Sequence, residues 1–166
     1  MFGQPVVSGW GDFAAVMGSG SAALLGLLFV AVSIRVETIA KSAVLRNRTA
    51  QTLTLLLTGL LATALLTVPN QSKRALGVEY LVLALVVIGV AVFNDRRAGE
   101  SKSGSALAQS LGAINPTYVT CSLLVAAGVV LILGRRDGIY VLVPALAAVL
   151  VGGVVNAWLI LVKLTD

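Results

Sequence analysis

The chain has 166 residues and a net charge of +5, and 58% of its residues are hydrophobic while only 11% are charged. Soluble domains carry about 25% charged residues, so this composition leaves too little polar surface for a water-soluble fold and predicts one integral membrane domain. The basic residues flank apolar runs, where orientation and lipid headgroups explain them, and we therefore expect membrane lipids and no nucleic acid as partners. Histidine is absent and Cys121 is the single cysteine, which excludes an intramolecular disulfide.

The first apolar run, Phe13 to Ile34, has 22 residues without a charge. At about 1.5 Å per residue this run spans about 33 Å, close to the thickness of a bilayer's hydrocarbon core. Small residues recur every four positions at Gly18, Ala22 and Gly26, a spacing that lets another helix approach closely in lipid. Asp12 precedes the run and is the predicted N-cap. The sequence thus predicts a first span over 13–34 with a helix-packing ridge.

An amphipathic extension follows at 35–48. Its apolar residues recur at helical spacing, namely Val36, Ile39, Ala40, Ala43 and Val44. This pattern predicts that the first helix runs past the membrane or bends to lie on its surface. The turn is expected at Arg46-Asn47-Arg48.

The second span is predicted over 49–68 and is rich in leucine and threonine. Gly59 shares a helix face with Thr63 and Thr67, and threonine hydroxyls can bond to carbonyls of their own helix or to a neighbouring helix. We interpret this face as a packing stripe. A polar pathway is the alternative.

The third span is predicted over 75–93 and contains an acidic residue, Glu79. The run from Tyr80 to Phe93 reaches only about 21 Å, so Glu79 is expected within the membrane or at its edge. Two interpretations follow. Glu79 is an interfacial residue paired with Lys73 or Arg74, or it is a membrane-embedded functional carboxylate.

A polar connection precedes the last two spans, and the part over 103–116 fits a loop, an interfacial helix or the start of a longer fourth helix. The fourth span is predicted over 117–133 and the fifth over 139–162, joined by a tight turn and therefore antiparallel. Ala148, Gly152 and Asn156 form a second small-residue ridge. Asn156 is expected to bond to a neighbouring helix, and with Glu79 it is the candidate membrane-embedded polar site.

These elements predict an all-α, polytopic membrane bundle of five transmembrane helices. Four spans plus an interfacial or re-entrant segment is the alternative. Eight Lys and Arg residues fall on one side of this five-span arrangement and four on the other, which places the N-terminus outside and the C-terminus in the cytoplasm. The basic residues expected to contact lipid headgroups on the cytoplasmic side are Arg35, Lys41, Arg46, Arg48, Arg96 and Arg97.

Motifs that carry catalytic chemistry are missing from the sequence. There is no metal-ligand spacing, no phosphate-binding glycine loop and no CxxC, and a Ser/His/Asp set is impossible without histidine. We therefore expect a protein that is not an enzyme and that uses no cofactor or metal.

The N-terminal pattern W-G-D-F at 10–13, followed by G-S-A-A-L-L-G-L-L-F-V-A-V-S-I at 20–34, resembles small multi-span bacterial inner-membrane proteins of unassigned function. The resemblance covers the first two spans. It implies a bacterial inner membrane and assigns no residue a role.

Two functional hypotheses follow. In the favoured one, the protein is a scaffold or accessory subunit that packs against itself, as a homo-oligomer, or against a larger membrane complex through its small-residue ridges. In the alternative, it is a homo-oligomeric ion channel or small-solute permease, with a pore between subunits or beside Glu79.

Overall fold

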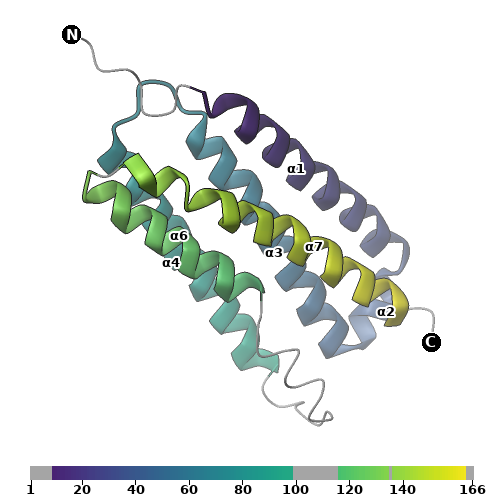
Figure 1. The fold of residues 1–166 in the computed structure, drawn as a ribbon. Helices are drawn as coiled ribbons and strands as arrows, with labels where there is room; N and C mark the ends of the chain where they lie inside the picture. The colour runs from purple at the N-terminus through teal and green to yellow at the C-terminus, as the bar shows by residue number, and fades with distance from the viewer. Residues whose placement is uncertain (1–8, 99–115, 135, 164–166) are drawn as a thin grey trace.

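The computed structural model describes residues 9–98, 116–134 and 136–163, and this part of the chain is all α-helical. The long helices run side by side as an elongated bundle (Figure 1). In chain order the elements are α1 (Gly11–Ile34), α2 (Val36–Lys41), α3 (Ala43–Leu66), α4 (Lys73–Ala98), α6 (Pro116–Ile132), the 3-10 helix η2 (Arg136–Ile139) and α7 (Leu142–Lys163). Of the region predicted over 103–116, residues 103–115 lie outside the described part of the chain.

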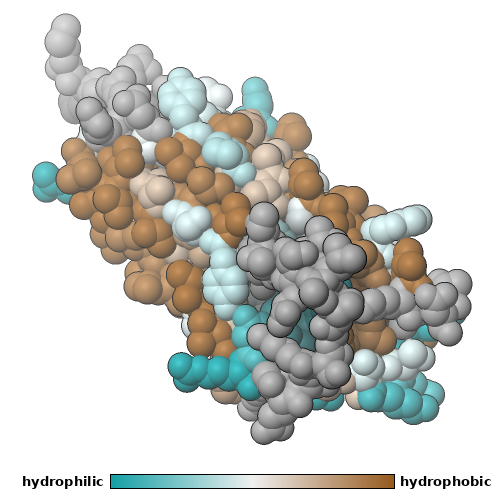
Figure 2. Space-filling model, turned by 60° about the horizontal axis from the view of Figure 1, so that its bottom comes forward, coloured by the Kyte–Doolittle hydropathy of each residue, from teal (hydrophilic) through white to brown (hydrophobic). Residues whose placement is uncertain are grey.

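Four helices, α1, α3, α4 and α7, are long and apolar enough to cross a membrane, and α6 is a shorter apolar helix of 17 residues. The outer surface is apolar as well, since Phe29, Leu85 and Val151 are 66%, 67% and 64% exposed. In Figure 2 apolar residues cover most of the coloured surface along the middle of the bundle, and hydrophilic residues gather at its lower end. Such a surface suits lipid rather than water. The expected all-α fold is confirmed, and four of its helices are candidate membrane spans by their length and composition.

Within the bundle, α4 packs most extensively against α6, and α1 packs against α3. Helix α7 lies against α3 and α6 and completes the core. Tyr80 is fully buried in this core, and its hydroxyl donates a hydrogen bond of 2.9 Å to the carbonyl of Ala62. This bond connects α4 to α3, and it satisfies a polar group that would be costly to bury alone.

The turn between the first two long helices differs from the prediction. Ser42 has extended backbone, and its hydroxyl accepts a hydrogen bond from the backbone N–H of Leu45 at 3.4 Å, which starts α3 at Ala43. Residues 43–48 therefore belong to the second long helix, and the predicted turn at Arg46-Asn47-Arg48 is wrong. The N-cap serine separates the short helix α2 from α3, although the apolar pattern continues through it.

The start of α1 also differs. The N-cap position is Trp10, which makes no side-chain capping bond, and Asp12 lies in the first turn. The predicted N-cap role of Asp12 is therefore wrong. Its carboxylate still lies where it complements the positive end of the helix dipole.

Candidate functional site

At one end of the bundle, Asp95 joins three helices. The Gln51 amide on α3 donates to Oδ1 of Asp95 at 2.7 Å, and the Tyr118 hydroxyl on α6 donates to Oδ2 at 2.7 Å. Each carboxylate oxygen thus accepts a bond from a different helix, an arrangement that fixes the relative positions of α3, α4 and α6. The sequence pattern does not predict this cluster, because Asp95 follows the apolar run and belongs to the expected polar connection. An acid two residues after the apolar run of α4 was the available signal.

The threonine hydroxyls of α3 are bonded mainly within their own helix. Thr52 donates to the carbonyl of Arg48 at 2.8 Å and Thr58 to that of Thr54 at 2.7 Å. Thr63 donates to the carbonyl of Gly59 at 3.0 Å. Hydroxyls used in this way offer no free row of ligands, so this geometry favours the packing stripe over a polar pathway.

Glu79 lies half-buried on α4 near the opposite end of the bundle from Asp95. The amide of Gln71, in the connection between α3 and α4, donates a hydrogen bond to Oε2 of Glu79. Lys73 instead directs its ammonium to the carbonyl of Gly134, at 3.5 Å. The partner of Glu79 is therefore a neutral amide rather than the predicted Lys73 or Arg74.

The second predicted ridge is used inside the protein. Gly152 is buried, and a Cβ there would lie 2.6 Å from Cβ of Pro116 and 3.1 Å from Cδ2 of Leu55. Ala148 and Asn156, on the same helix, are half-buried. Small residues thus let α7 approach α3 and the start of α6.

Gly59 on α3 has a similar role. A Cβ at this position would lie 2.7 Å from Cγ1 of Val149 and 2.8 Å from Oγ of Ser21. This glycine therefore marks where α3 meets both α7 and α1.

The first predicted ridge divides between two directions. A Cβ at Gly18 would lie 2.7 Å from Oγ1 of Thr63 on α3, so Gly18 faces inward. Ala22 is exposed, and a Cβ at Gly26 would have no neighbour within 4 Å in the described chain outside its own helix. On a helix of 3.6 residues per turn, four residues turn about 40° more than one full circle. Residues spaced by four therefore shift gradually around the helix, and this ridge turns from the inner side to the outer side.

The outward residues form a surface of their own. At about 100° per residue, four exposed small residues of α1 fall within about 60° around the helix. We name this stripe the outer face of α1, and its residues are Ala15, Ser19, Ala22 and Gly26. Helix α1 also buries the smallest share of its apolar stretch among the four long helices. The outer face is thus a small-residue surface without a partner in the described chain.

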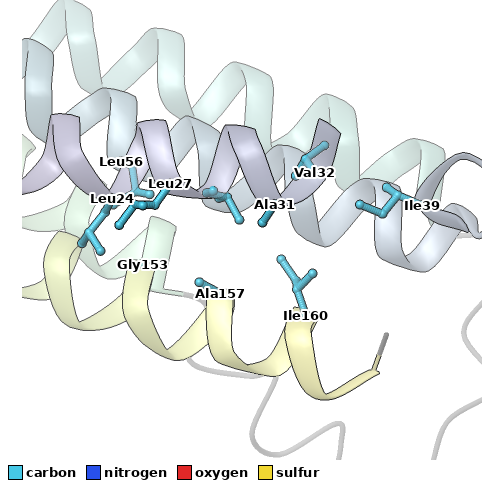
Figure 3. Close-up of a pocket in the computed structure, with 10 residues that line it drawn as sticks. Leu24, Leu27, Ala31, Val32, Ile39, Leu56, Gly153, Ala157 and Ile160 are labelled. Carbon is cyan, nitrogen blue, oxygen red and sulfur yellow. The ribbon is translucent and has the colours of Figure 1, made fainter. Parts of the chain in front are cut away.

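On another side of α1, a groove separates it from α7 (Figure 3). The groove encloses about 200 Å³ and ends at Ile39 of α2. Apolar residues line it, namely Leu24, Leu27, Leu28, Ala31 and Val32 of α1, Leu56 of α3, and Gly153, Ala157 and Ile160 of α7.

The predicted headgroup-contacting residues lie at one end of the bundle, where α1 and α4 end and α3 begins. Four of them are exposed and one, Arg48, is half-buried; the exposed ones are Arg35, Lys41, Arg46 and Arg96. The side chain of Arg97 lies outside the described part of the structure.

Within the described residues, no three His, Cys, Asp or Glu side chains gather closely enough to hold a metal ion. No protein-family model, curated protein or solved structure matches the chain.

Proposed function

We propose that this protein is a small, non-enzymatic subunit of the bacterial inner membrane that associates through the outer face of α1, with copies of itself or within a larger complex. The observation that carries the proposal is the open space at Gly26, where a Cβ would have no neighbour within 4 Å in the described chain outside its own helix. Ala15, Ser19 and Ala22 share that side and are exposed. In lipid, small residues on an exposed helix face permit close contact with a second helix.

The interior of the same protein supports this interpretation of the outer face. Glycines lie at close contacts between its helices, as at Gly18, Gly59 and Gly152, where an added Cβ would come within 3 Å of a neighbouring helix. The outer face of α1 is likewise made of small residues, and it lies on the least buried of the four long helices. A second copy of α1, or a helix of a partner subunit, would give this face the contacts that the internal glycines already have.

The proposal includes five membrane spans, with α6 as the fourth. Two contacts support this count. Tyr118, near the start of α6, bonds to Asp95 near the end of α4, and Gly134, just after α6, accepts from Lys73 at the start of α4. Helix α6 therefore extends alongside the whole apolar length of α4. With five spans, the excess of basic residues predicts an N-terminus outside and a C-terminus in the cytoplasm. Reporters fused to the two ends test this, since both ends on one side would contradict it.

The association is tested by replacing Ala22 and Gly26 with leucine, separately and together. The matched control is Gly89→Leu on α4, because Gly89 is also exposed and a Cβ there would have no neighbour within 4 Å. The measurement is the mass and composition of the particle extracted from native membranes in a mild detergent. We expect the outer-face variants to give a smaller particle and the control to match wild type. An unchanged particle in the double variant would reject the proposal.

An ion channel or small-solute permease is the second candidate. The observation in its favour is the half-buried carboxylate of Glu79, in the second turn of α4. Rings of carboxylates in an oligomer select cations. Liposomes containing purified protein should then pass cations faster than empty vesicles, and Glu79→Gln should change that flux. A rate equal to that of empty vesicles would reject this candidate.

A further inference from the structure

The groove between α1 and α7 is wedge-shaped. Near its closed end the two helices meet, since a Cβ at Gly20 would lie 3.7 Å from Cδ2 of Leu150. Toward α2 the helices separate, and Ala31 and Ile160 lie on opposite walls with space between them (Figure 3). The wedge therefore widens toward the end of the bundle that carries the predicted headgroup-contacting residues.

The chemistry of the wedge is that of a hydrocarbon site. Ala157 on α7 has a small side chain facing the space, and the residues that line the space are all apolar. Leu27, which lines the groove, is 68% exposed, so the groove opens to the surroundings of the bundle. An apolar space left empty loses the dispersion contacts of its walls, and in a membrane the adjacent material is lipid.

Basic residues surround the short helix α2, which lines the wide end of the groove. Ile39 of α2 lines this end, and the guanidinium of Arg46 donates to the carbonyl of Ala40, the next residue, at 3.5 Å. Arg35 and Lys41 are exposed at the two ends of α2. Glu37 is the acidic residue on the same short helix. The three basic side chains outnumber it, so the field there attracts an anionic headgroup.

We infer that the groove between α1 and α7 binds one acyl chain of an anionic glycerophospholipid, whose headgroup contacts Arg35, Lys41 and Arg46. A volume of about 200 Å³ fits part of a single chain, whereas a helix about 10 Å in diameter would need α1 and α7 to move apart. This inference goes beyond the proposed association. Ala31 follows Ala22 by nine residues, about 180° around α1, so the lipid site and the outer face point in opposite directions.

The first test uses the wild-type protein. Purified and delipidated protein is mixed in detergent with phosphatidylglycerol or with phosphatidylcholine of the same acyl chains, and bound lipid is counted by native mass spectrometry. We expect one tightly retained phosphatidylglycerol per chain and weaker retention of phosphatidylcholine. Equal retention of the two lipids would overturn the inference, because it would indicate an unselective lipid shell.

The second test fills the groove from either wall with Ala157→Phe and Ala31→Phe. The matched control is Ala126→Phe, because Ala126 is exposed on α6, outside the groove. We expect both groove variants to lose the retained phosphatidylglycerol and the control to keep it, with helix content by circular dichroism unchanged. If one groove variant fails to fold, the other still fills the same space. Retention at the wild-type level in a folded groove variant would overturn the inference.

The third test removes charge. Arg35→Gln and Arg46→Gln should each weaken phosphatidylglycerol retention about fivefold, the factor that one basic residue near an anionic lipid contributes. Arg74→Gln is the control, because Arg74 is exposed at the opposite end of the bundle. If Arg35→Gln, Arg46→Gln and Arg74→Gln all weaken phosphatidylglycerol retention equally, the headgroup does not bind beside α2 and the inference is overturned.

Discussion

Gly77 on α4 and Gly128 on α6 bring the backbones of their helices into direct contact. A Cβ at Gly77 would lie 2.7 Å from the carbonyl oxygen of Gly128, and a Cβ at Gly128 would lie 2.8 Å from the carbonyl oxygen of Gly77. The atoms that would clash belong to backbone, which cannot rotate away as a side chain can. Glycine at both positions is therefore a requirement of the α4–α6 contact.

The first prediction is that Gly77→Ala and Gly128→Ala each destabilise the protein. Forcing a methyl group into a packed interior costs about 1–3 kcal/mol, which outweighs the gain in helix propensity of about 1 kcal/mol from glycine to alanine. Reversible unfolding in mixed detergent micelles, followed by circular dichroism, measures the difference. Gly89→Ala on α4 is the control and should be neutral or slightly stabilising, since a Cβ there would meet nothing within 4 Å. Equal stability of all three variants would contradict the close contact.

The second prediction concerns Asp95. Asp95→Ala should destabilise the protein by about 1–3 kcal/mol, because two donors, on Gln51 and Tyr118, lose their acceptor. Tyr118→Phe removes one bond from a partly exposed side chain and should cost about 0.6 kcal/mol, the average for such bonds in membrane proteins. A double-mutant cycle for Asp95 and Tyr118, measured by the same unfolding assay, should give a non-zero coupling energy. Additive effects would show that the bond contributes nothing to stability.

The sequence predicted the helical membrane fold because long uncharged runs can satisfy their backbone groups in lipid only as helices. It did not predict where close helix contacts occur. Neither Gly77 nor Gly128 has another small residue three or four positions away in the sequence. Their pairing depends on the register of two helices that are separate in the chain. Gly26 does have Ala22 four positions before it, and yet it faces outward. Spacing along one helix does not specify which neighbour, if any, a residue faces.

The sequence pattern also failed to predict the helix cap at Ser42 and the hydrogen-bond partner of Glu79. The apolar period over 35–48 continues through Ser42, whose extended backbone and capping hydrogen bond from Leu45 separate α2 from α3. A charged partner was expected for Glu79, but the connection between α3 and α4 brings the amide of Gln71 to it instead. Both outcomes depend on backbone geometry in short connections, which hydrophobic periodicity does not encode.

The third prediction separates a structural from a functional role of Glu79. Glu79→Gln keeps a carbonyl oxygen that can accept from Gln71, so stability should change by less than about 0.5 kcal/mol. Glu79→Ala leaves that amide without its acceptor and should cost about 1 kcal/mol. Unfolding of both variants and of Gln71→Ala measures these effects. A large loss in Glu79→Gln would mean that the charge itself stabilises the fold.

The fourth prediction identifies the neighbour of the outer face of α1. The native thiol of Cys121 is buried, so in a Cys121→Ala background a cysteine at Ala22 is the accessible thiol. If α1 packs against a second copy of itself about a two-fold axis through the outer face, Ala22→Cys should form a disulfide-linked dimer in membranes under mild oxidation, because identical positions meet near such an axis. If α1 packs against another subunit, the dimer should be absent, and a bifunctional reagent should link Ala22→Cys to a protein of different mass. Gly89→Cys, exposed on α4, sets the background from random collision, and Ala22→Cys crosslinking no faster than this control would reject association through α1.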